Sequence, residues 1–125
     1  MIKEIKDISL IEDIFKNIFN QELKTTIYSK IVVYEDKEIL GFMIYDLIYD
    51  RIELEYIGVL EEYRNKKIAS KLMEYLISIN LPISLEVDIN NNKAIKLYEK
   101  FNFKRVSIRE KYYNNHDAYL MVKEV

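Results

Sequence analysis

Hydrophobic positions follow two different spacings in the middle of this chain, and they predict a strand that leads into a helix. Apolar and acidic residues alternate from Ile52 to Tyr56, a period of two that places Ile52, Leu54 and Tyr56 on one face of a strand. The apolar residues that follow recur at the spacing of one helix face. These are Ile68, Leu72, Met73, Leu76 and Ile79.

A short basic turn joins this strand to this helix. It carries Arg64, Lys66 and Lys67, and Lys71 follows in the first helical turn. The first amides of a helix have no partner within it and lie at the positive end of the helix dipole. The turn therefore favours an anion site, with an ordinary solvated basic turn as the alternative.

Similar patterns predict the remaining elements. Strands are expected at 1–6, 27–34, 39–46, 83–89, 103–113 and 117–123, and helices at 9–19 and 91–101. Ser9 and Glu12 have the spacing of a capping box, and Asn102 can end its helix in the left-handed conformation. Turns are expected at 35–38, 47–51 and 114–115. The strand–helix–strand unit over 52–89 predicts a right-handed parallel crossover, and hence a mixed sheet of the α/β or α+β class.

Composition narrows the function classes. The 125 residues fit a single domain, 1–125, and half of them are hydrophobic. A net charge of −2 predicts no general attraction to nucleic acid or to an anionic membrane. The absence of cysteine excludes disulfides, thiolate metal sites and an acyl-cysteine mechanism. We find no signal peptide and no apolar run of membrane-spanning length, so a cytoplasmic location is expected.

Three motifs resemble the GNAT superfamily of acyl-CoA N-acyltransferases. Arg64-x-x-Lys67-x-Ala69 resembles its phosphate-binding loop, Arg/Gln-x-x-Gly-x-Gly/Ala. The block from Asn91 to Phe103 resembles Asn-x-x-Ala-x-x-Leu-Tyr-x-x-x-Gly-Phe. The third group is similar to the ribosomal-protein alanine N-acetyltransferases, the RimI-like group, and consists of Leu85-Glu86-Val87, Ile108-Arg109-x-x-Tyr112-Tyr113 and Asp117-Ala118. Together the motifs cover residues 39–123. The resemblance implies a mostly antiparallel central sheet with a parallel pair at its centre and helices on both faces.

The chain departs from the family pattern at several positions. Lys67 replaces a glycine, so a long cation stands where the backbone approaches a pyrophosphate; it either obstructs the loop or binds a phosphate directly. Glu61 replaces a common proline, and Asn102 replaces a glycine. The N-terminal region, which usually shapes the acceptor site, is short for the group.

The resemblance implies that acetyl-CoA binds between the strand that ends at Val59 and the strand at 83–87, without a metal. The backbone of Ile57, Gly58 and Val59 would pair with the pantetheine arm, and Gly58 would permit a bulge or a close approach. The remaining residues would hold the pyrophosphate or support the cofactor: Arg64, Asn65, Lys66, Lys67, Ile68, Ala69, Ser70 and Asn91. A packing glycine at 58 and a helix cap at 91 are the alternatives.

Glu86 matches the group's general base and Tyr98 its general acid. Glu53 or Glu55 is the rival base, and Tyr98 is alternatively a core aromatic residue. A phenol is a weaker acid than a thiol by about 2 kcal/mol, so Tyr98 would act largely through a hydrogen bond. Arg109, Tyr112 and Tyr113 could line the acceptor mouth or be ordinary sheet residues. We interpret His116, in an expected turn, as a solvated bystander.

These residues predict transfer of an acetyl group from acetyl-CoA to a primary amine. At pH 7 about a tenth of an α-amine is neutral, against about one lysine in 2,500, so a single carboxylate base suits a protein N-terminus, such as that of a ribosomal protein. Two alternatives stay open at this point. One is acetylation of a small amine, such as a polyamine or amino sugar, and the other is a non-catalytic acyl-CoA-binding module.

Overall fold

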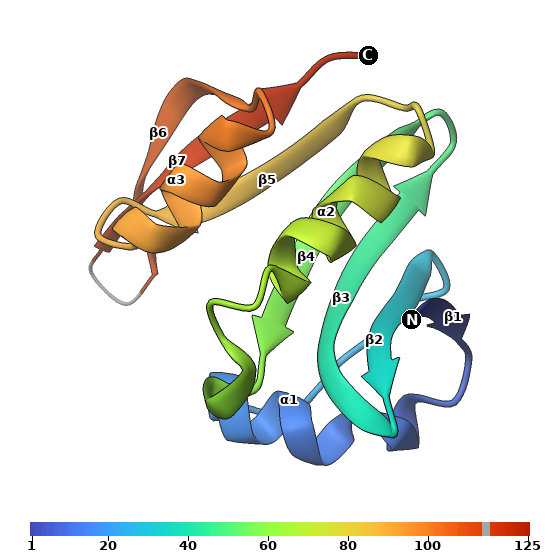
Figure 1. The fold of residues 1–125 in the computed structure, drawn as a ribbon. Helices are drawn as coiled ribbons and strands as arrows, with labels where there is room; N and C mark the ends of the chain where they lie inside the picture. The colour runs from blue at the N-terminus through green and yellow to red at the C-terminus, as the bar shows by residue number, and fades with distance from the viewer. Residues whose placement is uncertain (114–115) are drawn as a thin grey trace.

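The chain forms one seven-stranded sheet, with strand order β1-β2-β3-β4-β5-β7-β6 (Figure 1). The computed structural model describes residues 1–113 and 116–125, with the backbone alone for 111–113. The strands are β1 (Ile2–Ile5), β2 (Ser29–Asp36), β3 (Glu38–Ile48), β4 (Arg51–Val59), β5 (Ile83–Asp88), β6 (Lys104–Tyr113) and β7 (His116–Lys123). β4 and β5 pair in parallel and each other described pair is antiparallel, which confirms the expected mixed sheet.

Helices cover both faces of the sheet, as expected. They are α1 (Glu12–Phe19), α2 (Ile68–Ser78) and α3 (Asn92–Lys100), with short 3-10 turns η1 (Ile8–Leu10) and η2 (Glu61–Tyr63). Phe15 of α1 and Ile11, which directly precedes the helix, are buried against one face in a cluster with Phe42 and Ile44 of β3. α2 and α3 pack on the opposite face in a second, larger cluster. The alternation of β5 divides its residues in the same way, because Ile83, Leu85 and Val87 are buried on the α2 and α3 side.

A bulge in β4 changes the shape of the sheet at its centre. Ile44 pairs with Tyr56 and Tyr45 pairs with Leu54, so Glu55 is the extra residue of β4. A bulge bends its strand and reverses the side-chain alternation beyond it. Tyr56 therefore faces α1, where its ring lies 4.8 Å from that of Phe15. The prediction that Tyr56 shares a face with Ile52 and Leu54 is wrong for this reason.

β4 and β5 separate where the bulge begins. Their parallel pairing runs from Ile52 opposite Ile83 to Leu54 opposite Leu85. Beyond that point the two strands diverge, as Figure 1 shows. Residues 55–59 and 86–88 therefore form two strand edges that border an opening at the centre of the sheet.

The N-terminal region differs from the prediction in two respects. Ser9 does not cap α1; instead Asp7 caps η1 by accepting from the Ser9 backbone N–H, and α1 begins at Glu12 without a side-chain cap. The capping-box prediction is therefore wrong. The second strand begins at Ser29 rather than at residue 27, and Ile27 is 90% exposed.

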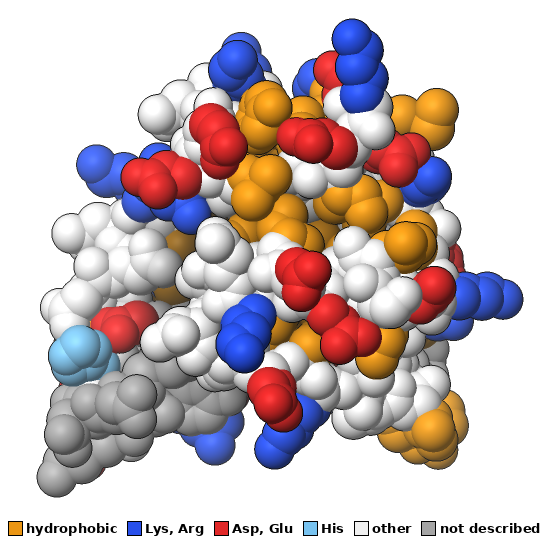
Figure 2. All heavy atoms as spheres, turned by 90° about the horizontal axis from the view of Figure 1, so that it is seen from below, with side chains coloured by type: hydrophobic (Ala, Val, Ile, Leu, Met, Phe, Trp, Pro, Cys, Tyr) orange, Lys and Arg blue, Asp and Glu red, His pale blue; other side chains and the backbone are white. Residues whose placement is uncertain are grey.

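The prediction for Asn102 is confirmed. Asn102 adopts φ 70°, the left-handed conformation expected after α3. The turn at 114–115 lies outside the described residues. No helix in the described part of the chain is long and apolar enough to cross a membrane. Acidic and basic side chains are interspersed on the face shown in Figure 2, with hydrophobic side chains exposed between them.

Candidate active site

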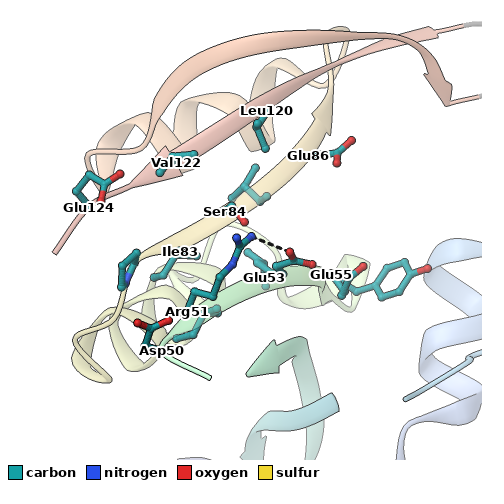
Figure 3. Close-up of a pocket in the computed structure, with 15 residues that line it drawn as sticks. Asp50, Arg51, Glu53, Glu55, Ile83, Ser84, Glu86, Leu120, Val122 and Glu124 are labelled. Carbon is teal, nitrogen blue, oxygen red and sulfur yellow. Dashed lines mark hydrogen bonds and ion pairs between the residues drawn. The ribbon is translucent and has the colours of Figure 1, made fainter. Parts of the chain in front are cut away.

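The strand opening continues into a depression on the sheet face opposite α2 and α3. It has a volume of about 660 Å³ and is lined by the β4, β5 and β7 strands and the turn before β4. Figure 3 shows Glu53 and Glu55 of β4 and Ser84 and Glu86 of β5 facing it. The alternation of β5 places Glu86 on this face, as expected from the sequence.

Carboxylates gather along the β4 side of the depression. Arg51 makes an ion pair with Glu53, with Nη2 and Oε1 2.8 Å apart. Partial desolvation, followed by the charges of Asp46 and Glu53, raises the pKa of Glu55. The carboxylate oxygens of Asp46, Glu53 and Glu55 lie within 4.8 Å of one another. Exposed acidic groups can approach this closely without an ion, and the absence of a resident metal stays a prediction.

Sequence reasoning missed Asp46. This residue approaches Glu55 because β3 pairs with β4, which places Asp46 opposite Glu53. Counting residues outward from the β3–β4 turn would have found that cross-strand pair. The bulge at Glu55, which decides how the third carboxylate joins the other two, has no comparable signal in the sequence.

Glu86 is held by an arginine from another strand. Its Oε1 accepts from Nη1 of Arg109 at 2.5 Å, and the Glu86 side chain is 19% exposed. Both residues belong to the predicted site, and the structure brings them into direct contact. Tyr112 and Tyr113 were considered either as lining residues of the acceptor mouth or as ordinary sheet residues, and their side chains lie outside the described part of the chain.

Tyr98 lies on the other side of the sheet from Glu86. It is 7% exposed, belongs to the cluster under α2 and α3, and its ring centroid lies 5.8 Å from that of Phe103. The core position considered as an alternative is therefore what the fold provides. Side chains from opposite faces can meet one substrate only where the sheet is open, which is where β4 and β5 separate.

The loop before α2 has the backbone conformation that a glycine would supply. Asn65 and Lys67 have φ of 66° and 63°, both in the left-handed region. Lys67 is the N-cap of α2 and makes no side-chain cap hydrogen bond. Such turns make successive amides converge on a concave site, and the amides of residues 68–70 lie in the first turn of α2. The substitution of lysine for glycine thus keeps the shape of the loop.

Two predicted loop residues also serve the structure. The Nε of Arg64 donates to the carbonyl oxygen of Val59 at 3.1 Å, which ties the loop to the end of β4. The Ile68 side chain is 4% exposed and packs in the core, so only its backbone can face a ligand. Lys66 and Lys67 are exposed.

Gly58 packs against helix α1 and does not lie at a bulge. An added Cβ would lie 3.2 Å from Cδ1 of Ile18 and 3.3 Å from Cε2 of Phe19. The bulge expected at Gly58 lies at Glu55 instead, and the packing alternative describes the contacts of Gly58.

Two further residues have structural partners. The Oδ1 of Asn91 accepts from the Ala94 backbone N–H at 3.2 Å, which is the helix-cap alternative. His116 begins β7, so its expected place in a turn is wrong. Its side chain is 56% exposed, as expected of a solvated residue, and its Nδ1 lies 2.9 Å from Oδ2 of Asp88. The Asn90 backbone N–H, and to a smaller extent His116, lowers the pKa of Asp88.

Comparison with known proteins agrees with this architecture. The model of the acetyltransferase (GNAT) family matches residues 5–103. The N-alpha-acetyltransferase of Saccharolobus solfataricus is 46% identical over an alignment of 74 positions, which covers 54% of this chain and 44% of that protein. The chain thus matches less than half the length of that relative. The putative ribosomal protein bS18-alanine N-acetyltransferase of Bacillus subtilis is 28% identical over an alignment of 128 positions, which covers 96% of this chain and 85% of that protein.

Solved structures show the same fold. The crystal structure of the ribosomal-protein-S18-alanine N-acetyltransferase from Escherichia coli superposes with a TM-score of 0.87 at 22% identity. The match covers 98% of this chain and 91% of that one. With a family match that extends over most of its length, the chain belongs to the acetyltransferase (GNAT) family.

Proposed function

We propose that this protein binds acetyl-CoA between β4 and β5 and transfers the acetyl group to the N-terminal α-amine of a protein. The observation that carries the proposal is the separation of β4 from β5 beside the uncapped start of α2. The names of the two relatives, an N-alpha-acetyltransferase and an alanine N-acetyltransferase of a ribosomal protein, support the choice of acceptor. A ribosomal protein is therefore one candidate partner, and a cytoplasmic location stays a prediction.

The backbone groups at the opening are suited to bind acetyl-CoA. In an antiparallel ladder, alternate residues direct their backbone groups to the partner strand. The Leu60 N–H donates to the carbonyl oxygen of Leu40 in β3. The backbone groups of Gly58 therefore also point toward β3, and those of Ile57 and Val59 point toward the opening. Their backbone groups would pair with the pantetheine arm. The Val59 carbonyl already accepts from Arg64, which leaves its N–H and the groups of Ile57 for this task.

The loop and the start of α2 would hold the pyrophosphate. The first helical amides, from Ile68 to Ser70, supply donors at the positive end of the dipole. The exposed ammonium groups of Lys66 and Lys67 add positive charge. Asn91 would support the cofactor through its amide nitrogen, because its Oδ1 caps α3.

Glu86 and Tyr98 would carry the proton movements. The acceptor nitrogen attacks the thioester carbonyl carbon while Glu86, directly or through water, accepts the proton that the nitrogen loses. As the C–S bond breaks, the Tyr98 hydroxyl would donate a hydrogen bond to the departing sulfur. The neighbouring Glu55 and Glu53 line the same depression and are the rival bases.

A mass-spectrometric acceptor screen tests the proposal. The protein is incubated with acetyl-CoA and a set of peptides with free N-termini, beside polyamines and amino sugars, and the acetylated nitrogen is located by fragmentation. We expect acetylation at peptide α-amines. Acetylation of small amines alone would refute the acceptor class. Calorimetric binding of acetyl-CoA, with neither acetylation nor thiol release, would instead support a non-catalytic module.

A further inference from the structure

An ion pair in the depression joins two strands that are not neighbours. Arg109 lies on β6 and Glu86 on β5, and β7 runs between them. Strands two positions apart are separated by about 9–10 Å, so both side chains must extend along the sheet surface to meet. The contact is therefore fixed by the order of the strands and not by sequence proximity.

The register explains why the arginine can cross β7. Ala118 of β7 pairs with Arg109 on one side and with Asp88 of β5 on the other. Leu120, the next residue of β7 on the same face, pairs with Glu86. The methyl group of Ala118 presents little obstruction, so the guanidinium reaches Glu86 diagonally across the strand. The two side chains differ in exposure: that of Arg109 is 56% exposed, whereas that of Glu86 is 19% exposed.

Glu86 lies near other carboxylates, which could displace its side chain. Glu53 and Glu55 line the same depression, and the negative charge of Glu86 is among the causes that raise the pKa of Glu55. Like charges in one cavity repel, and a glutamate side chain has several rotamers through which it can turn away. Arg51 makes an ion pair with Glu53, and Arg109 makes the ion pair with Glu86.

We infer that Arg109 is a positioning residue, which holds the Glu86 carboxylate at the strand opening in the orientation that proton transfer requires. The inference rests on the proposed function, because it assigns Arg109 a role through Glu86. A displacement of about 1 Å at a reacting group can cost about 100-fold in rate. Loss of Arg109 is therefore expected to lower kcat by about 10-fold to 100-fold, with little change in the KM for acetyl-CoA.

A double-mutant cycle measures the coupling between the two residues. The proteins are the wild type, Arg109→Ala, Glu86→Gln and the double variant, each assayed with a peptide found in the acceptor screen. We expect Arg109→Ala to lower kcat in the wild type and to have little further effect in the Glu86→Gln background. Arg109→Lys should recover part of the loss, because lysine retains the charge but not the guanidinium geometry.

Arg105→Ala is the matched control. Arg105 lies on the same strand and also has an acidic partner, Glu99, at 3.4 Å. It stacks on Tyr119, 4.6 Å from the ring centroid, away from Glu86. Arg105→Ala should retain the wild-type kcat. It also reports any general effect on the protein of removing an arginine from β6. Thermal unfolding of each variant separates a loss of folded protein from a loss of rate.

Two results would overturn the inference. One is an equal loss from Arg109→Ala in the presence and absence of the Glu86 carboxylate, which would assign Arg109 to the acceptor or to the fold. The other is a crystal structure of Arg109→Ala in which Glu86 keeps its single orientation, whereas we expect several rotamers. The crystal structure needs no turnover, so it still decides the inference if the wild type acetylates no amine and the proposed function fails.

Discussion

Replacing Gly58 with alanine separates two explanations of this glycine, packing against α1 and close approach of a cofactor. The new Cβ would lie 3.2–3.3 Å from Ile18, Phe19 and Phe42. These contacts are a few tenths of an ångström tighter than ordinary van der Waals contact. All three atoms are the ends of side chains that can shift slightly. Overpacking of this kind is expected to lower the free energy of unfolding by about 1–2 kcal/mol, and Tm by about 3–10 °C.

Gly41→Ala provides the comparison. A Cβ there would lie 3.1 Å from the carbonyl oxygen of Gly58 and 3.0 Å from Cγ2 of Ile68. The backbone oxygen cannot rotate away, so we expect a larger loss for Gly41→Ala, about 2–3 kcal/mol. Thermal and urea unfolding followed by circular dichroism give the two stabilities.

Calorimetry with acetyl-CoA, well below both unfolding midpoints, completes the test. If packing explains Gly58, the affinity of Gly58→Ala stays within about twofold of wild type, a difference of ~0.4 kcal/mol. An unchanged Tm together with an affinity that falls about tenfold or more, ~1.4 kcal/mol, would refute the packing explanation. It would return Gly58 to the role of close backbone approach.

Four further changes have defined outcomes. Glu86→Gln should lower kcat by about 100-fold or more with little change in acetyl-CoA affinity, and an unchanged rate would move the base to Glu53 or Glu55. Tyr98→Phe should lower kcat by about 10-fold to 100-fold while Tm changes little, because the ring stays buried; an unchanged kcat would leave Tyr98 a core residue. Lys67→Ala should weaken acetyl-CoA binding in calorimetry if the ammonium binds a phosphate, and tighter binding would show that the side chain obstructs the loop. Glu55→Gln should raise Tm at pH 7 but not at pH 4: the folded-state pKa of Glu55 is raised, so its protonation favours the folded state and that stability is lost as the pH rises through this pKa. An equal effect at both pH values would contradict this reasoning.

Most of the local elements, and the family, could be predicted from the amino-acid sequence. The alternation at 83–87 and the helical stripe from Ile68 depend on periods of a few residues, which local backbone geometry produces without reference to the rest of the chain. Asn102 could be assigned to a left-handed turn for the same reason. Glu86 was placed on the open face of its strand by parity alone. The phosphate-loop motif located the start of α2, although its glycine is absent.

The way in which these elements form a site depends on contacts between distant segments and could not be predicted. The bulge at Glu55 arises from the register between β3 and β4, and it turns Tyr56 toward α1 and coincides with the point where β4 leaves β5. The pairing of Glu86 with Arg109 depends on the order of three strands and on the small side chain of Ala118 between them. Both features are contacts between different segments of the chain. The hydrophobic period of a strand predicts which face a residue occupies but not which residue of the neighbouring strand lies opposite it.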